Sequence, residues 1–197
     1  MRVPKTNRGI KTKNKLLKAA ERVFGEKGYF DSSISEITRK AKVSTGTFYI
    51  YYNSKIEIFK DLIVNLNHEL RKVISISVSD LTKRKDIEEM GFKKFFEFLK
   101  RHKKLYRIVR QAEYIDPALF SWYYKKIAEG YSKGLDKAME NKEFKKGNSE
   151  LLSFALMGIA DFVGMRYVLW EDEINDDIIR ELMDFIFNGI LDKTSKD

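Results

Sequence analysis

The sequence contains no cysteine, two prolines and two histidines. Without cysteine, the chain has no disulfide framework, no thiolate zinc site and no cysteine nucleophile. His68 and His102 lie on separate expected helices, with no serine, aspartate or metal ligand at a matching spacing. We therefore expect a protein that is not an enzyme and that needs no cofactor or metal.

Long apolar runs are missing as well. No uninterrupted apolar run approaches the roughly 18 residues that a membrane span needs, and the first residues lack the apolar core of a signal peptide. These features lead us to expect a cytoplasmic protein with no membrane attachment.

The net charge of +9 is concentrated at one end of the chain. Residues 1–60 hold 14 Lys and Arg against five Asp and Glu, whereas residues 61–197 hold 24 of each sign. A basic segment on a neutral body is typical of a module that binds a polyanion, most often nucleic acid. A solvated lysine-rich surface would give the same count, so the choice depends on the residues within this segment.

Apolar residues recur three and four positions apart through most of the chain, which predicts an all-α protein. Gly28 is placed to end the first helix, and Ser33 and Glu36 have the spacing of a capping box at the start of the next. Residues 1–9 are expected to form a basic arm. The expected helices cover residues 11–27, 35–41, 44–51, 54–77, 86–102, 104–114, 117–141, 149–170 and 174–192.

Two of these helices are too short to be stable alone in water. Joined by a tight turn and braced by a longer helix on each side, they match the helix-turn-helix plan. In the second of them, Phe48 and Tyr52 are four residues apart and are expected to face the core. The outward side then carries small and hydroxyl residues that let the helix approach DNA closely. These outward residues are Thr45, Gly46, Thr47, Ile50 and Tyr51.

Three further side chains suit contacts with the DNA backbone. The hydroxyls of Tyr49 and Tyr51 are expected to donate to phosphate oxygens, and Lys55 combines its charge with the free N–H groups at the start of a helix. Ser44 or Thr45 is expected to cap the second short helix. Capping and contact with a phosphate are compatible roles for these hydroxyls.

The stretch from Gly28 to Phe59, GYFDSSISEITRKAKVSTGTFYIYYNSKIEIF, resembles the DNA-binding domain of the TetR family of transcriptional regulators. The resemblance rests on GYFDSS, on Ile37 and Ala41, on VS-x-GT-F-Y, on the tyrosine pair and on SK before an apolar helix. It implies a DNA-binding domain over 1–53, with its motif at about 33–52, and a ligand-binding and dimerisation domain over 54–197.

The resemblance also implies roles and partners. Thr45, Gly46 and Thr47 would lie in the major groove of an operator, and Ser35 would contact a phosphate. A small, largely apolar effector would release the protein from DNA, and the resemblance implies a repressor rather than an activator. The last two helices, 149–170 and 174–192, would form a homodimer, in which Ala155, Gly158 and Gly164 allow close approach. Family members often carry glycine where Lys42 stands, and a lysine in a left-handed turn costs about 1 kcal/mol.

The body of the chain is expected to hold the effector between helices 86–102, 104–114, 117–141 and 149–170. The side chains expected to line this pocket are mostly apolar or aromatic. They are Phe96, Leu99, Tyr106, Trp122, Tyr123, Ile127, Phe154, Met157 and Asp161. Core packing would explain the same residues at helical spacing.

A different class of function remains open at this point. A basic helical protein that binds RNA or a membrane surface without catalysis would use the same N-terminal lysines. That alternative leaves the VSTGTFY turn unexplained.

Overall fold

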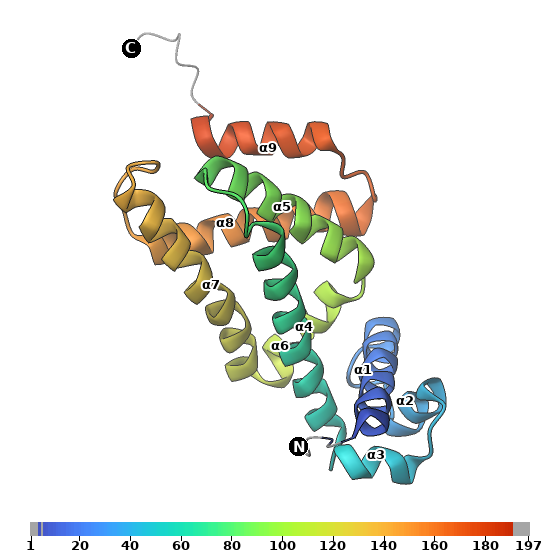
Figure 1. Cartoon of the computed structure of the whole chain (residues 1–197). Coiled ribbons are helices and arrows are strands. Elements are labelled where there is room, and N and C mark those ends of the chain that lie inside the picture. Colours follow the sequence, from blue (N-terminus) through green and yellow to red (C-terminus); the bar gives the residue numbers. More distant parts are fainter. Residues whose placement is uncertain (1–3, 5, 191–197) are drawn as a thin grey trace. The chain divides into compact units, whose positions relative to one another are not determined.

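The computed structural model describes residue 4 and residues 6–190, and every regular element within that part of the chain is a helix. The all-α prediction is therefore confirmed. The helices are α1 (Asn7–Lys27), α2 (Ile34–Ala41), α3 (Thr45–Tyr51), α4 (Lys55–Ser77), α5 (Arg84–Arg101), α6 (Leu105–Ile115), α7 (Pro117–Glu140), α8 (Ser149–Gly164), the π-helix η1 (Met165–Trp170) and α9 (Asp176–Asn188) (Figure 1).

The chain forms two compact units. Unit 1 comprises residues 1–71 and 102–130, and unit 2 comprises residues 72–101 and 131–197. The long helices α4 and α7 each contribute residues to both units.

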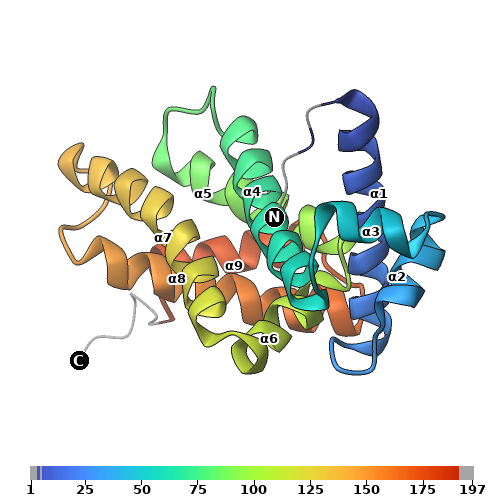
Figure 2. The same cartoon turned by 90° about the horizontal axis from the view of Figure 1, so that it is seen from below.

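Within unit 1, α1, α2 and α3 form a group that we call the head (Figures 1 and 2). Helix α1 packs against α2, and α2 packs against α3. The core of the head consists of apolar side chains that are buried completely, because each short helix must be held by its inward residues. They include Leu16, Ala20, Phe24, Ile37 and Phe48 of the head, together with Ile58 and Phe59 of α4.

The ends of the head helices follow the sequence signals. Gly28 ends α1 with φ of 84°, and its N–H donates to the carbonyl of Phe24. Ser33 and Glu36 form the predicted capping box at the start of α2. Lys42 ends α2 in the left-handed conformation, with φ of 55° and ψ of 47°, as predicted. Ser44, rather than Thr45, caps α3.

Two expectations about helix bounds differ from the structure. Helix α1 begins at Asn7, because the side chain of Thr6 accepts a hydrogen bond from the N–H of Gly9 and caps it. Residues 7–9 are therefore helical rather than part of an arm. The expected helix 149–170 changes to π-helical geometry at Met165. The expected end of the last helix at residue 192 lies outside the described residues.

Within unit 2, α5 packs against α8, η1 and α9. Gly164 permits the close approach of α8, because a Cβ atom there would lie 2.7 Å from Cδ2 of Leu99. Gly158 has open space around it and is exposed, as is Ala155. Of the three small residues expected at a helix contact, only Gly164 is used for packing within the chain, and the other two lie on an exposed face.

Candidate nucleic-acid interface

Helix α3 divides its side chains between core and solvent. Phe48 is completely buried, Tyr52 just after the helix is 1% exposed, and their ring centroids lie 5.5 Å apart. Tyr49 and Ile50 expose 51% and 54% of their surface. The prediction that Phe48 and Tyr52 face the core is confirmed, and the opposite side of α3 is open to a partner.

The hydroxyl of Tyr52 anchors the end of α3 to α4. It donates a 2.7 Å hydrogen bond to Oδ2 of Asp61, and Nζ of Lys13 in α1 lies 2.8 Å from the same oxygen. Burial, and then the hydrogen bond to Asp61, raise the pKa of Tyr52 far above its usual range. The hydroxyl therefore keeps its proton and remains a donor, so that three helices meet at one buried carboxylate.

The hydroxyl and glycine positions expected at DNA lie near the starts of α2 and α3. Oγ of Ser44 accepts a hydrogen bond of 3.1 Å from the N–H of Thr47 and lies 2.9 Å from Oγ1 of the same residue. Ser35, Thr45 and Gly46 are exposed. All of these positions are accessible on the head, and their contacts with DNA stay predictions.

Lys55 has different surroundings from those expected of a phosphate contact. Its ammonium group donates to the carbonyl oxygens of Tyr29 at 2.7 Å, Phe30 at 3.3 Å and Ser32 at 2.8 Å. An ammonium group has three donors, and all three are used here. Lys55 can therefore reach a phosphate only by giving up bonds that hold the loop between α1 and α2.

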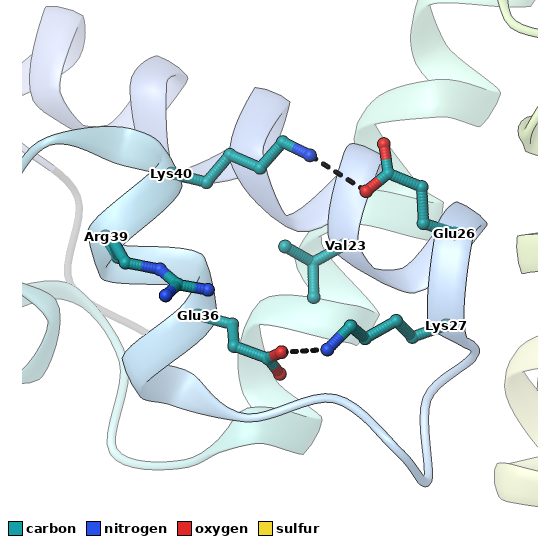
Figure 3. Close-up of a pocket in the computed structure, with 6 residues that line it drawn as sticks. All are labelled: Val23, Glu26, Lys27, Glu36, Arg39 and Lys40. Carbon is teal, nitrogen blue, oxygen red and sulfur yellow. Dashed lines mark hydrogen bonds and ion pairs between the residues drawn. The ribbon is translucent and has the colours of Figure 1, made fainter.

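A small hollow of about 150 Å³ lies between α1 and α2, and its lysines and glutamates form ion pairs, whereas Arg39 in the same lining forms none within the described residues (Figure 3). Lys27 pairs with Glu36, and Nζ of Lys40 lies 2.8 Å from Oε2 of Glu26. Lys104, just before α6, also pairs with Glu26, and the hydrogen bonds from Lys104 and Lys40 lower the pKa of Glu26 to about 2. These lysines are therefore occupied with carboxylates and make a poor site for an anion.

A second, wider hollow of about 420 Å³ lies between the first turns of α1 and the turn before α3, and we call it the α1–α3 hollow. Its lining includes Arg8, Thr12, Lys42, Thr47 and Tyr51. The sequence did not indicate Arg8 and Thr12 as site residues. The signal that was available is Thr6, three residues before Gly9, which begins α1 early enough to bring both side chains here.

The residues expected to line an effector pocket are divided between the two units. Phe96, Leu99 and Tyr123 are buried, and Phe154 is exposed. The other five are partly buried: Tyr106, Trp122, Ile127, Met157 and Asp161. Neither of the two hollows in the head contains any of the nine. An effector pocket among them stays a prediction.

Neither histidine is placed in a way that indicates catalysis. His68 is exposed, and Nδ1 of His102 lies 2.9 Å from Oε1 of Glu21. Within the described residues, no group of three or more His, Cys, Asp or Glu side chains is arranged to hold a metal ion.

Helix α8 carries large apolar side chains on its surface. Leu151 exposes 68% of its surface and Phe162 exposes 67%. By length and composition alone, Ser149–Trp170 is apolar enough to cross a membrane, but one such helix is weak evidence, because the core helix of a soluble protein passes the same test. Asp161 and Arg166 interrupt the apolar residues within this segment.

Comparisons with known proteins agree with the geometry of the head. The family model described as "Bacterial regulatory proteins, tetR family" matches residues 16–62. The uncharacterized HTH-type transcriptional regulator YdgC of Bacillus subtilis is 31% identical over 106 residues. That match covers 52% of this chain and spans about half of YdgC, at 54%.

Solved structures share the fold over nearly the whole chain. A Clostridium perfringens protein proposed as a fatty acid metabolism regulator is 25% identical with a TM-score of 0.79, over 91% of this chain and 100% of that one. FadR from Bacillus subtilis, in complex with stearoyl-CoA, has 20% identity and a TM-score of 0.79, over 90% of this chain and 99% of that one. At 20% identity, the second likeness concerns the fold alone.

Proposed function

Because the chain belongs to the TetR family of transcriptional regulators, we propose that it binds an operator as a homodimer and is released by a small, largely apolar effector. The observation that carries this proposal is the division of α3, with Phe48 and Tyr52 buried and Tyr49 and Ile50 exposed. A short helix held in this way offers its outer side to the major groove. The proposed role is that of a repressor rather than an enzyme.

The contacts with DNA fall into two classes. Thr45 and Thr47 read base edges in the groove, and Gly46 between them allows the close approach. Tyr49, Tyr51 and Ser35 hold phosphates. Phosphate contacts fix the position of the protein, and base contacts select the sequence. In place of the expected phosphate contact, we propose that the Lys55 side chain holds the loop between α1 and α2.

The homodimer uses α8 and α9. Besides Leu151 and Phe162, Gly158 lies on the open surface of α8, and Phe185 of α9 is 43% exposed. Burying such side chains against a second copy removes apolar surface from water, which is the main driving force of association. A dimer of this kind presents two α3 helices to two half-sites, roughly 34–36 Å apart or somewhat further.

The effector acts by favouring a conformation that does not fit both half-sites. A ligand lowers affinity for DNA only as far as it binds the two conformations differently. The side chains proposed to receive it are the mostly apolar set that runs from Phe96 to Asp161. The acyl chain of a long-chain acyl-CoA is the first apolar group to test, since FadR, which has a similar fold, is seen in complex with stearoyl-CoA.

A binding assay with the full chain tests the proposal. A labelled duplex from upstream of its own gene is titrated with excess competitor DNA at two salt concentrations. Binding that survives competitor, saturates at two chains per duplex and weakens with salt supports an operator-reading dimer. Acyl-CoA is then added to the complex, and release supports the effector class.

Other outcomes count against particular parts of the proposal. If the protein shows no preference for that duplex over competitor DNA, a binding sequence is selected from a pool of random duplexes. Failure to enrich any sequence would indicate a general polyanion binder, which is the alternative left by the charge distribution.

A further inference from the structure

The α1–α3 hollow is lined by basic residues and by no acidic ones, unlike the hollow in Figure 3, which contains two lysine–glutamate pairs. Arg8 comes from the first turn of α1, and Lys42 comes from the turn between α2 and α3. No acidic residue lines this hollow, and the first turn of α1 contains none. Within the part of the chain that the structure describes, neither basic side chain is engaged in an ion pair.

Hydroxyl groups complete the lining. Thr12, Thr47 and Tyr51 all line the hollow. The Thr12 hydroxyl donates to the carbonyl of Arg8 at 3.0 Å, and Oγ1 of Thr47 lies 2.9 Å from Oγ of Ser44. The Tyr51 hydroxyl is 3.5 Å from the position that a Cβ atom on Gly9 would take. One guanidinium group and one ammonium group, with a tyrosine hydroxyl beside them, are groups that bind phosphate oxygens in proteins. Thr47 and Tyr51 belong to α3, so an anion in the hollow lies next to the helix proposed to enter the groove.

The backbone at Lys42 gives a second, independent indication. A residue other than glycine in the left-handed conformation costs roughly 1–2 kcal/mol. Glycine would remove that cost, and the exposed Lys42 side chain makes no ion pair that offsets it. The turn after α2 requires the left-handed conformation but does not require a lysine there, and strained residues of this kind cluster at functional sites.

We propose that Lys42 and Arg8 together bind one phosphate of the DNA backbone in the α1–α3 hollow. This inference rests on the proposed operator binding and adds a phosphate contact outside α3. Because a phosphate carries no sequence information, the contact raises affinity for every operator sequence by a similar factor.

The test uses Lys42→Gly and Lys42→Asn in the full chain, together with Arg8→Gln. Glycine and asparagine both accept the left-handed conformation, and asparagine does so without adding as much flexibility. Affinity for a selected operator and for mismatched duplexes is measured over a series of salt concentrations. Thermal unfolding is measured for the same proteins.

The variants should lose affinity for DNA without losing thermal stability. Lys42→Gly should unfold at the same or a higher temperature, yet bind DNA roughly threefold to tenfold more weakly. The slope of log affinity against log salt should fall by about 0.9, which corresponds to one lost phosphate contact. Arg8→Gln should act in the same direction, and the ratio of operator to mismatched binding should not change.

Lys40→Ala is the matched control. It removes the same charge two residues earlier in the chain, but Lys40 is paired with Glu26 in the other hollow. Its salt slope should stay that of the parent protein. Unchanged affinity and slope in both Lys42 variants, while the parent still selects an operator, would overturn the phosphate site alone. A parent protein that selects no operator would instead overturn the proposed function.

Discussion

Nζ of Lys55 lies 4.4 Å from the centroid of the Tyr29 ring and donates to the carbonyl oxygen of the same residue at 2.7 Å. The ammonium group is thus held from one side by an aromatic face and from others by loop carbonyls, including that of Ser32. A compact cation with donors in several directions suits such a cage. Lys55 therefore joins the first turn of α4 to the loop that connects α1 and α2.

This arrangement predicts that arginine cannot replace Lys55. Lys55→Met should lower the free energy of unfolding by about 1–3 kcal/mol, since it removes hydrogen bonds from a charged donor. Lys55→Arg should be destabilised as well, because a planar guanidinium does not fit three converging carbonyls. Chemical denaturation measures both. A phosphate contact predicts the reverse, with Lys55→Arg as stable as the parent protein and binding DNA equally well.

Tyr52→Phe tests the anchor between α3 and α4. The substitution keeps the ring and removes the donor to Asp61, which retains Lys13 as a partner. We expect a loss of about 1–2 kcal/mol in unfolding free energy. Tyr51→Phe is the control, because that side chain lies one residue away and has no such buried acceptor. Equal stability of the two variants would show that the Tyr52 hydrogen bond contributes nothing.

Acid should weaken the contact between α1 and α6. Hydrogen bonds from Lys104 and then Lys40 lower the pKa of Glu26 from 4.5 to about 2. A carboxyl group with a lowered pKa in the folded state stabilises the fold fully above its unfolded pKa, and that contribution is lost as pH falls from about 4.5 towards 2. Glu26 is exposed, so solvent screening keeps the effect small.

The measurement compares the parent protein with Glu26→Gln. The difference in melting temperature should be present at pH 7 and should shrink steadily below pH 4.5. A difference that is the same at pH 7 and pH 2.5 would show that the carboxylate charge does not contribute.

The sequence was sufficient to predict those features that depend on residues a few positions apart. The Ser33–Glu36 capping box, the left-handed Lys42 and the inward pair Phe48 and Tyr52 each depend on spacings of a few positions. Gly28 was recognised for the same reason. Local signals of this kind act within one helix or turn, so no knowledge of tertiary packing was needed.

Features that depend on residues far apart in the sequence could not be predicted in this way. The carbonyls around Lys55 come from residues about 25 positions earlier, and a lysine at a helix start gives no sign of them. The same limit applies to Gly158 and Gly164, which the sequence treats alike, although only Gly164 packs against Leu99. The basic residues 1–9 by themselves indicate an arm, whereas the cap that Thr6 provides places Arg8 in α1.

Phe162→Glu tests the proposed dimer. Phe162 is 67% exposed on α8, so a charge there should leave the fold of one chain intact. In the dimer the same charge would be buried without a partner, which costs about 2 kcal/mol or more and raises the dissociation constant roughly 30-fold. Ile76→Glu is the matched control, because Ile76 is 64% exposed on α4, outside the proposed interface.

The measurement is sedimentation over a range of concentrations. Phe162→Glu should dissociate into monomers at concentrations at which the parent protein and Ile76→Glu remain dimers. Phe162→Glu should also lose operator binding, because one half-site alone binds weakly. Dimers that persist in Phe162→Glu with the affinity of the parent protein would show that α8 does not form the interface.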